Sequence, residues 1–270
     1  MRRLSKLYTA IIFVFMYAPI AVFIFFSFNS SNSTAVFEGF SLKWYSELFK
    51  SEATLKALTN TLTLAVTSAV IATVLGTIAA VGINYMKKGP VRSATMTLTN
   101  IPMMNADIVT GISLMLLFSF FSNALDLRDM FGFGTLLIAH ITFNLPYVIL
   151  SVLPRLKQLD PHLMEAAQDL GCTPFQSFIK VVIPSILPGI LSGLMMSFTL
   201  SIDDFVISYF VSGSEFQTLP LVIETMTKKR VTPDMYALST IIFVTILVLL
   251  ILTNVIKKDT ANNKKGGTKD

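Results

Sequence analysis

The stretch "LDPHLMEAAQDLGCTPFQSFIKVVIP", residues 159–184, lies between two strongly apolar segments of the chain. Asp160 followed by Pro161 is typical of a helix start. Apolar residues then recur at helical spacing and predict one apolar face, formed by Leu163, Ala166, Ala167 and Leu170. Gly171 is predicted to end this helix, and the Thr-Pro pair that follows begins a second. We expect two short helices whose apolar face either fits a groove on a partner protein or packs beneath the rest of the chain.

The segments on both sides of this stretch are typical of a membrane protein. The chain has 270 residues, of which 53% are hydrophobic and only 14% charged, and its mean hydropathy is +0.68. A spanning helix needs about 20 largely apolar residues. The sequence therefore predicts an all-α membrane protein, a single domain over 1–270, with six spans at about 7–28, 62–85, 98–121, 135–153, 186–211 and 236–256.

Basic residues predict the orientation of these spans. They lie at the ends of apolar runs rather than in one patch, which argues against nucleic acid despite the net charge of +5. With the N-terminus inside, 14 of the 21 Lys and Arg residues are inside. We therefore expect a multi-pass protein with both termini in the cytoplasm, a cytoplasmic loop over 155–184 and a polar, disordered tail over 257–270. Outside, residues 41–49 predict a short interfacial helix with Ser41 as its N-cap.

Three acidic residues fall inside predicted spans, namely Asp107, Asp203 and Asp204. A carboxylate at the bilayer centre costs at least about 2.5 kcal/mol, so such residues usually face a watery path or find a partner. No Lys or Arg lies in the spans to pair with them. Adjacent residues on a helix point about 100° apart. Either Asp203 and Asp204 therefore face different neighbours, or the helix is broken there with Ser201 and Asp203 as caps. Asp107 is left open between a packing hydrogen bond and ligand contact.

The spacing in the inside loop carries a resemblance to a known family. Glu165-Ala166-Ala167, three residues, Gly171, nine residues and then "VVIP" resembles the EAA loop of bacterial ABC importer permeases. Val and Ile stand at positions 181 and 183, where that motif has Ile and Leu. The stretches "SFTLSIDDFVISYFVSG" (197–213), "LPLVIETM" (219–226), "MYAPIAVFIFFSFN" (16–29) and "WYSELF" (44–49) look like the permeases of spermidine/putrescine importers.

This resemblance implies a type I importer-like permease in the bacterial cytoplasmic membrane. The coupling helix would dock on a dimer of separate ATPase subunits through Leu163, Glu165, Ala166, Ala167, Leu170 and Gly171. A homologous second permease and an extracytoplasmic polyamine-binding protein would complete the system. No phosphate-binding G-x-x-x-x-G-K-[ST] motif occurs in the chain, so we expect no cofactor here and ATP–Mg on the ATPase. The chain is then a transport subunit and not an enzyme.

A polyamine carries several ammonium groups on an apolar chain, which separated carboxylates and aromatic rings suit. The residues expected to line its path are Asp107, Asp203, Asp204, Tyr17 and Tyr209. His140, in the fourth span, is interpreted as a hydrogen-bonded buried histidine rather than a proton relay. The single cysteine, Cys172, excludes an internal disulfide, and we predict no metal site.

Other functions stay open at this point. A proton-coupled secondary transporter of a small organic cation could use the same aspartates, but it would not need an ATPase-docking face. An importer permease for another small solute fits the same motifs. An intramembrane aspartyl protease would need Gly-x-Gly-Asp at one acid, whereas Ala106 and Ile202 precede the acids here.

Overall fold

The computed structural model describes residues 2–31, 36–126, 130–214, 216–229, 235–245, 247–248 and 251. Within these residues all regular structure is helical, apart from one isolated β-bridge between Asn29 and Phe40. Five of the described helices are long and apolar enough to cross a membrane. The all-α prediction is therefore confirmed for this part of the chain. The sixth predicted span, 236–256, begins as an apolar helix over Met235–Thr245 and lies partly outside the described residues.

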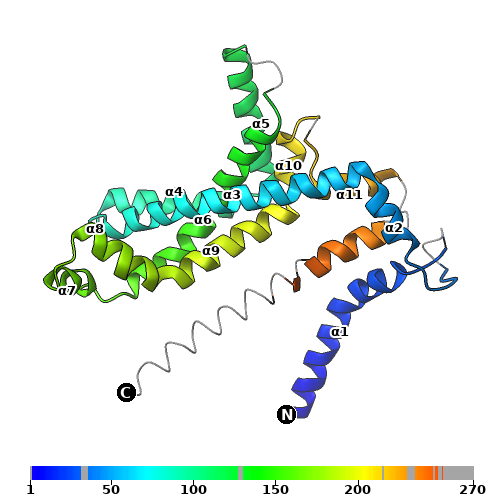
Figure 1. Cartoon of the computed structure of the whole chain (residues 1–270), viewed down its shortest axis with the longest axis horizontal. Helices are drawn as coiled ribbons and strands as arrows, with labels where there is room; N and C mark the ends of the chain where they lie inside the picture. Colours follow the sequence, from blue (N-terminus) through cyan, green and yellow to red (C-terminus); the bar gives the residue numbers. More distant parts are fainter. Residues whose placement is uncertain are drawn as a thin grey trace. The chain divides into compact units, whose positions relative to one another are not determined.

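The helices follow one another along the chain with short connections (Figure 1). They are α1 (Arg2–Phe26), α2 (Lys43–Lys50), α3 (Glu52–Tyr85), α4 (Pro90–Met104), α5 (Asp107–Ala124), α6 (Phe133–Lys157), α7 (Leu163–Asp169), α8 (Pro174–Ser177), the π-helix η1 (Phe178–Val182), α9 (Ile183–Asp203), α10 (Val206–Val211) and α11 (Leu219–Lys229). Helices α8, η1 and α9 join without a break into one rod of 30 residues. The predicted tail over 257–270 lies outside the described residues.

The chain divides into two compact units. The first contains the described residues of 1–58 and 222–254, and the second contains Thr59–Leu221. In the first unit, the loop after α1 is tied to α2, because the Trp44 indole donates a hydrogen bond of 2.7 Å to the carbonyl oxygen of Asn29. Helix α2 confirms the short helix predicted over 41–49. Its N-cap residue is Leu42, while the Ser41 hydroxyl accepts a hydrogen bond from the Lys43 N–H.

The second unit is centred on α6 and α9, which lie side by side (Figure 1). Glycines at the contact let the two backbones approach. A Cβ atom on Gly189 would lie 2.7 Å from the Arg155 side chain, and one on Gly193 would lie 3.2 Å from the Val148 Cα. These glycines form a small-xxx-small pair of the kind that brings membrane helices together. A Cβ atom on Gly76 of α3 would likewise lie 2.6 Å from the Val148 side chain, so α3, α6 and α9 approach one another around Val148.

The predicted span over 98–121 is wrong as a single helix. Helix α4 ends at Met104, Asn105 and Ala106 have extended backbones, and α5 begins at Asp107. Pro102 lies in the last turn of α4, where it has no backbone N–H to donate to the preceding turn. The Asn105 side chain can compete for backbone hydrogen bonds, which favours a helix end at this place. Helix α5 is the membrane-length element, and its Gly111 lies against Phe210 of α10.

Candidate functional site

The predicted span over 186–211 is broken beside the two adjacent aspartates. Helix α9 ends at Asp203, Asp204 adopts an extended backbone, and α10 starts at Val206. The Asp204 carboxylate caps the new helix: it accepts hydrogen bonds from the Ile207 N–H at 3.2 Å and the Ser208 N–H at 2.8 Å. The Ser208 hydroxyl donates a further one at 3.0 Å. The broken-helix alternative is therefore correct, but the capping carboxylate belongs to Asp204, next to the N-cap residue Phe205, rather than to Asp203, and Ser201 does not cap the break.

Asp204 also has a partner on another helix. Its side chain is only 7% exposed, and its Oδ2 lies 3.5 Å from Nε2 of His140, a fully buried residue of α6. The same His140 nitrogen lies 3.4 Å from the Ser208 hydroxyl. The sequence did not predict the Asp204–His140 pair, because only Lys and Arg were considered as partners of the acids. A carboxylate that accepts this many hydrogen bonds holds the α9–α10 break against α6.

A chain of small polar groups continues from the break along the neighbouring helices. The Asn144 amide of α6 donates a hydrogen bond of 2.8 Å to the Ser201 hydroxyl of α9. The Ser201 hydroxyl also lies 3.0 Å from that of Ser68 on α3. All three residues are buried. The second unit thus contains a polar seam, formed by Ser68, Asn144 and Ser201, where apolar packing alone would be expected.

The two remaining acids lie in more open places. Asp203, at the last position of α9, and Asp107, in the first turn of α5, are both exposed. Within the described part of the chain, neither forms an ion pair with Lys, Arg or His. Helix α5, which begins with Asp107, packs on α10 through Gly111, and α10 begins three residues after Asp203.

The two candidate tyrosines differ in their surroundings. The Tyr209 ring lies 5.6 Å from that of Phe205 and 5.2 Å from that of Phe210, which builds an aromatic group directly after the break. Tyr17 belongs to the first unit, where it is exposed and stacks on Phe13. Tyr209 thus lies on α10, directly after the break, whereas Tyr17 belongs to another unit.

The loop over 155–184 forms two short helices, as predicted, with one correction. Helix α7 begins at Leu163 rather than at Asp160, because the Asp160 carboxylate accepts a hydrogen bond from the His162 N–H and closes a separate turn. Gly171 has a φ of +89°. The Gly171 N–H donates a hydrogen bond to the Gln168 carbonyl, and the Cys172 N–H donates one to the Ala167 carbonyl. This is the pattern of a Schellman helix end. Helix α8 begins with a capping box between Thr173 and Gln176.

The predicted apolar face of α7 is divided between the interior and solvent. Ala167 is buried and Leu163 half-buried, whereas Ala166 is exposed. Leu170 follows the last helical residue and is 87% exposed, since the turn at Gly171 directs it away from the bundle. Tyr85, at the end of α3, donates a hydrogen bond of 2.9 Å to the Met164 sulfur and holds α7 in place. The exposed residues of α7 are Glu165, Ala166, Gln168 and Asp169, and Leu170 extends this outward surface.

His162 and Glu165 form an exposed pair at the start of α7, with 2.9 Å between Nδ1 and Oε2. The hydrogen bond and charge of Glu165 raise the pKa of His162 above its ordinary value. A raised folded-state pKa means that the pair stabilises the turn at low pH and that this stabilisation is lost as pH rises through the raised value. We expect an NMR titration of the full chain to give His162 a pKa above about 6.5, and Glu165→Gln to bring it back. An unchanged titration in Glu165→Gln would contradict the pairing.

Comparison with known proteins shows the family. The profile described as "Binding-protein-dependent transport system inner membrane component" matches residues 72–259. The chain belongs to this family. It is accordingly a multi-pass inner membrane permease and a subunit of a binding-protein-dependent transport system. Among the described residues, no group of three or more His, Cys, Asp or Glu side chains could hold a metal ion.

Individual relatives cover nearly the whole chain. It is 39% identical over 259 residues to the spermidine/putrescine transport system permease protein PotC of Escherichia coli K12, which covers 96% of this chain and 95% of that protein. It is 39% identical over 230 residues to the putrescine transport system permease protein PotI of the same organism, covering 85% and 82%. The permease of Haemophilus influenzae named PotC is 36% identical and covers 94% and 96%.

Solved structures share the fold. A crystal structure of a bacterial ABC transporter involved in the import of the acidic polysaccharide alginate matches with a TM-score of 0.72 at 18% identity, covering 94% of each chain. A crystal structure of an amino acid ABC transporter matches with a TM-score of 0.58, covering 80% of this chain and 98% of that chain. At this identity, the likeness supports the ABC importer permease fold alone.

Proposed function

We propose that this chain is the membrane subunit of an ATP-driven importer that moves polyamines, spermidine or putrescine, into the cytoplasm. The observation that carries this proposal is the 39% identity, over 96% of the chain, to a spermidine/putrescine permease. The acids at the helix breaks support it. A cationic substrate needs carboxylates along its route, and in the described residues Asp107 and Asp203 have no cationic partner of their own.

We assign different roles to the two adjacent aspartates. Asp203 is exposed and would contact an ammonium group of the substrate, with Asp107, at the start of α5, as a second acid. Tyr209 would offer its ring to the same cation. Asp204 is buried and fully engaged with α10 and His140, so it would act by holding the break in place. Tyr17 remains a proposed pathway residue that rests on sequence alone.

We assign ATPase coupling to the outward surface of α7. Leu170 and Ala166 would enter a groove on the ATPase, Glu165 would pair at its rim, and Gly171 would fix the turn that presents them. Leu163 and Ala167 would support this surface from the inside. Closure of an ATPase dimer with bound ATP–Mg would then move α7 and open the path alternately to each side. A homologous second permease and an extracytoplasmic polyamine-binding protein complete this proposed system, with both termini of the chain in the cytoplasm.

The test is transport by proteoliposomes that hold this chain, its partner permease, the ATPase and the binding protein. We expect ATP-dependent uptake of radiolabelled spermidine or putrescine. Asp203→Asn should lower uptake about tenfold and leave basal ATP hydrolysis within about twofold, because it removes one charge-assisted contact. Asp126→Asn is the matched control, since Asp126 lies in another loop with a positive φ that Asn tolerates.

Three other outcomes would contradict parts of this proposal. Equal loss of uptake and ATP hydrolysis in Asp203→Asn would make Asp203 a structural residue. Absence of polyamine uptake by an assembled, ATP-hydrolysing complex would point to another solute. Uptake by this chain alone, driven by a pH gradient without ATP, would favour the proton-coupled transporter instead.

A further inference from the structure

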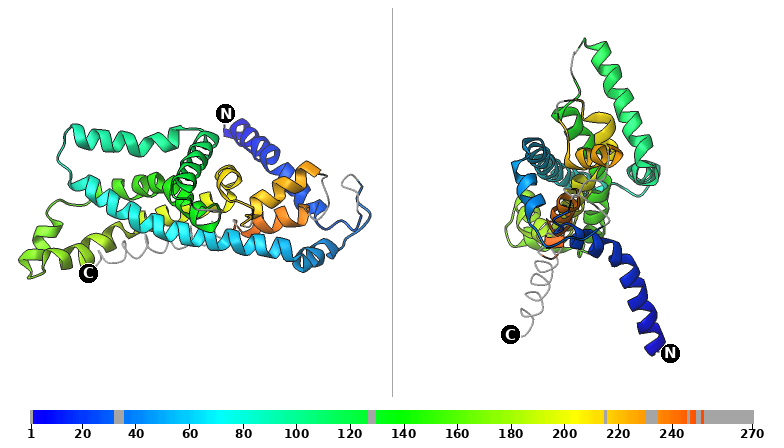
Figure 2. Two further views of the ribbon diagram at one scale, coloured as in Figure 1. Left: turned by 90° about the horizontal axis from the view of Figure 1, so that it is seen from above. Right: turned by 90° about the vertical axis from the view of Figure 1, so that its right-hand side faces the viewer.

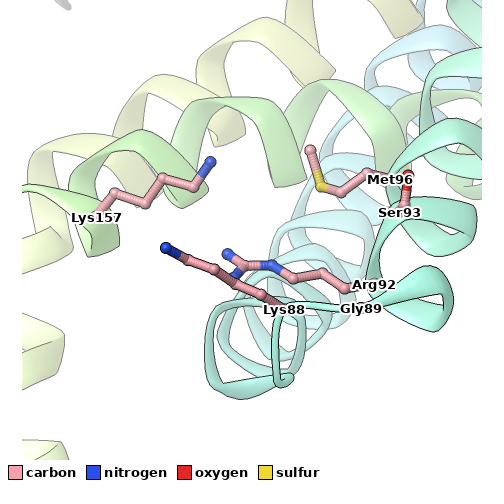
Figure 3. A pocket seen from close by; sticks show the side chains of 6 residues that line it. All are labelled: Lys88, Gly89, Arg92, Ser93, Met96 and Lys157. Carbon is pink, nitrogen blue, oxygen red and sulfur yellow. The ribbon is translucent and has the colours of Figure 1, made fainter.

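Three basic side chains converge on one pocket in the second unit. The pocket has a volume of about 550 Å³ and is lined by Lys88, Gly89, Arg92, Ser93, Met96 and Lys157. In Figure 3, Lys88 and Arg92 reach from one wall of the pocket toward Lys157 on the opposite wall. The pocket is far from the aspartates in sequence, and neither the proposed pathway nor the coupling surface uses any of these residues.

The turn after α3 builds one wall of the pocket and the end of α6 builds the other. Lys88 and Gly89 lie between α3 and α4, and Pro90 at the first helical position of α4 makes the chain reverse there (Figure 2). Arg92 follows in the first turn of α4, which packs on α6. Lys157 is the last residue of α6. The pocket therefore joins two cytoplasmic helix ends that are separated by more than 60 residues.

The pocket has the charge of an anion site. None of the three cations forms an ion pair with an acid in the part of the chain that the structure describes. Like charges held around one small space repel one another, and a bound anion relieves that repulsion. The N-terminus of α4 adds backbone N–H groups and a partial positive charge on the same side. A phosphate group, which accepts bidentate hydrogen bonds from Arg, suits these donors.

The position of the pocket at the predicted span ends favours one kind of anion. Met96 lines the pocket itself. Helix α4 has no buried residue, but its exposed apolar residues Val91, Leu98 and Ile101 lie on the face opposite the pocket, because adjacent helical residues point about 100° apart. A soluble anion would use only the cations. The pocket lies where the predicted spans leave the membrane, so the phosphate head of a lipid would reach the cations while its acyl chains stay in the bilayer.

We propose that this pocket binds the phosphate of an anionic phospholipid, and that the lipid holds the α3–α4 turn against the end of α6. The proposal is independent of the transported solute. Lys88, Arg92 and Lys157 would together form one lipid site. Single basic residues at helix ends would contact lipid headgroups without selecting one kind of lipid.

The test uses the full-length chain, purified in detergent with its partner permease and ATPase, and native mass spectrometry with added lipid. The probes are dioleoyl-phosphatidylglycerol and dioleoyl-phosphatidylcholine, which share acyl chains and differ in headgroup charge. We expect phosphatidylglycerol to be retained preferentially. The triple variant Lys88→Gln, Arg92→Gln, Lys157→Gln should retain about tenfold less of it, because each cation near the surface contributes to anionic-lipid binding.

The matched control is Lys6→Gln, Lys87→Gln, Lys180→Gln, which removes the same charge from the same predicted side but outside the pocket. This control should retain phosphatidylglycerol like the unmodified chain. Equal losses in both triple variants, or equal retention of the two lipids, would overturn the proposal in favour of general surface charge. Displacement of the lipid by millimolar glycerol 3-phosphate would overturn it in favour of a soluble anion site. Loss of ATPase association in the pocket variant, with lipid retention unchanged, would assign the pocket to protein docking.

Discussion

Replacing Asp204 with alanine is expected to lower the free energy of unfolding by about 3 kcal/mol. The loss of a helix cap costs about 1 kcal/mol, and leaving buried hydrogen-bonding groups unpaired costs about 1–3 kcal/mol more. Those groups are the Ile207 and Ser208 N–H donors, the Ser208 hydroxyl and His140. Thermal or denaturant unfolding of the full chain in detergent measures the effect, and a smaller yield of inserted protein should accompany it.

The neighbouring residue supplies the control for this prediction. Asp203 has the same side chain, but it is exposed and caps no helix. Asp203→Ala should therefore change the free energy of unfolding by about 0.5 kcal/mol or less, as is usual for exposed positions. Comparable destabilisation by the two variants would show that the break does not depend on the Asp204 cap. The two variants also distinguish an effect on stability from an effect on transport, because only the Asp203 variant is expected to impair uptake in a stable protein.

Replacing Gly171 with valine is expected to lower the stimulation of ATP hydrolysis by the binding protein about tenfold. The φ of +89° at Gly171 is unfavourable for any residue with a Cβ, and most of all for a β-branched one. A penalty of about 1–2 kcal/mol would shift the turn toward a continued or frayed helix. Leu170 would then leave the position in which the turn exposes it. ATP hydrolysis by the reconstituted complex, with and without loaded binding protein, measures the coupling.

Gly171→Asn is the matched control, because Asn adopts positive φ more readily than other residues with a side chain. We expect it to retain most of the stimulation. Gly171→Asp should give less stimulation than Gly171→Asn, since it adds a charge to the proposed docking surface. Glu165→Lys should block coupling, because it reverses a charge on that proposed surface. Open space surrounds Gly171, so none of these changes creates a clash in the interior. Full coupling in Gly171→Val would refute the role of this turn.

Local sequence patterns predicted much of the helical structure. The long apolar runs became α1, α3 and α6, since a run of this length has few alternatives to a spanning helix. The turn at Gly171 was predictable because its backbone geometry depends on neighbours in sequence. The break within 98–121 was not predicted, since Pro102 and Asn105 permit a helix end without requiring one. At Asp203 and Asp204 the sequence allowed either a regular or a broken helix.

Tertiary structure alone decided which acid is buried and what it contacts. His140 and Asp204 lie 64 positions apart, and Lys88 and Lys157 are 69 apart. Hydrophobic periodicity indicates which side of a helix is apolar, but it does not indicate which helix lies opposite. The glycine contacts of α9 on α6 fix that pairing, and with it the position of every polar group along both helices. The sequence by itself therefore determined the long helices, the two short helices of the loop over 155–184 and the family resemblance. The capped break, the polar seam and the basic pocket depend on close contacts between distant segments, which only the folded chain brings together.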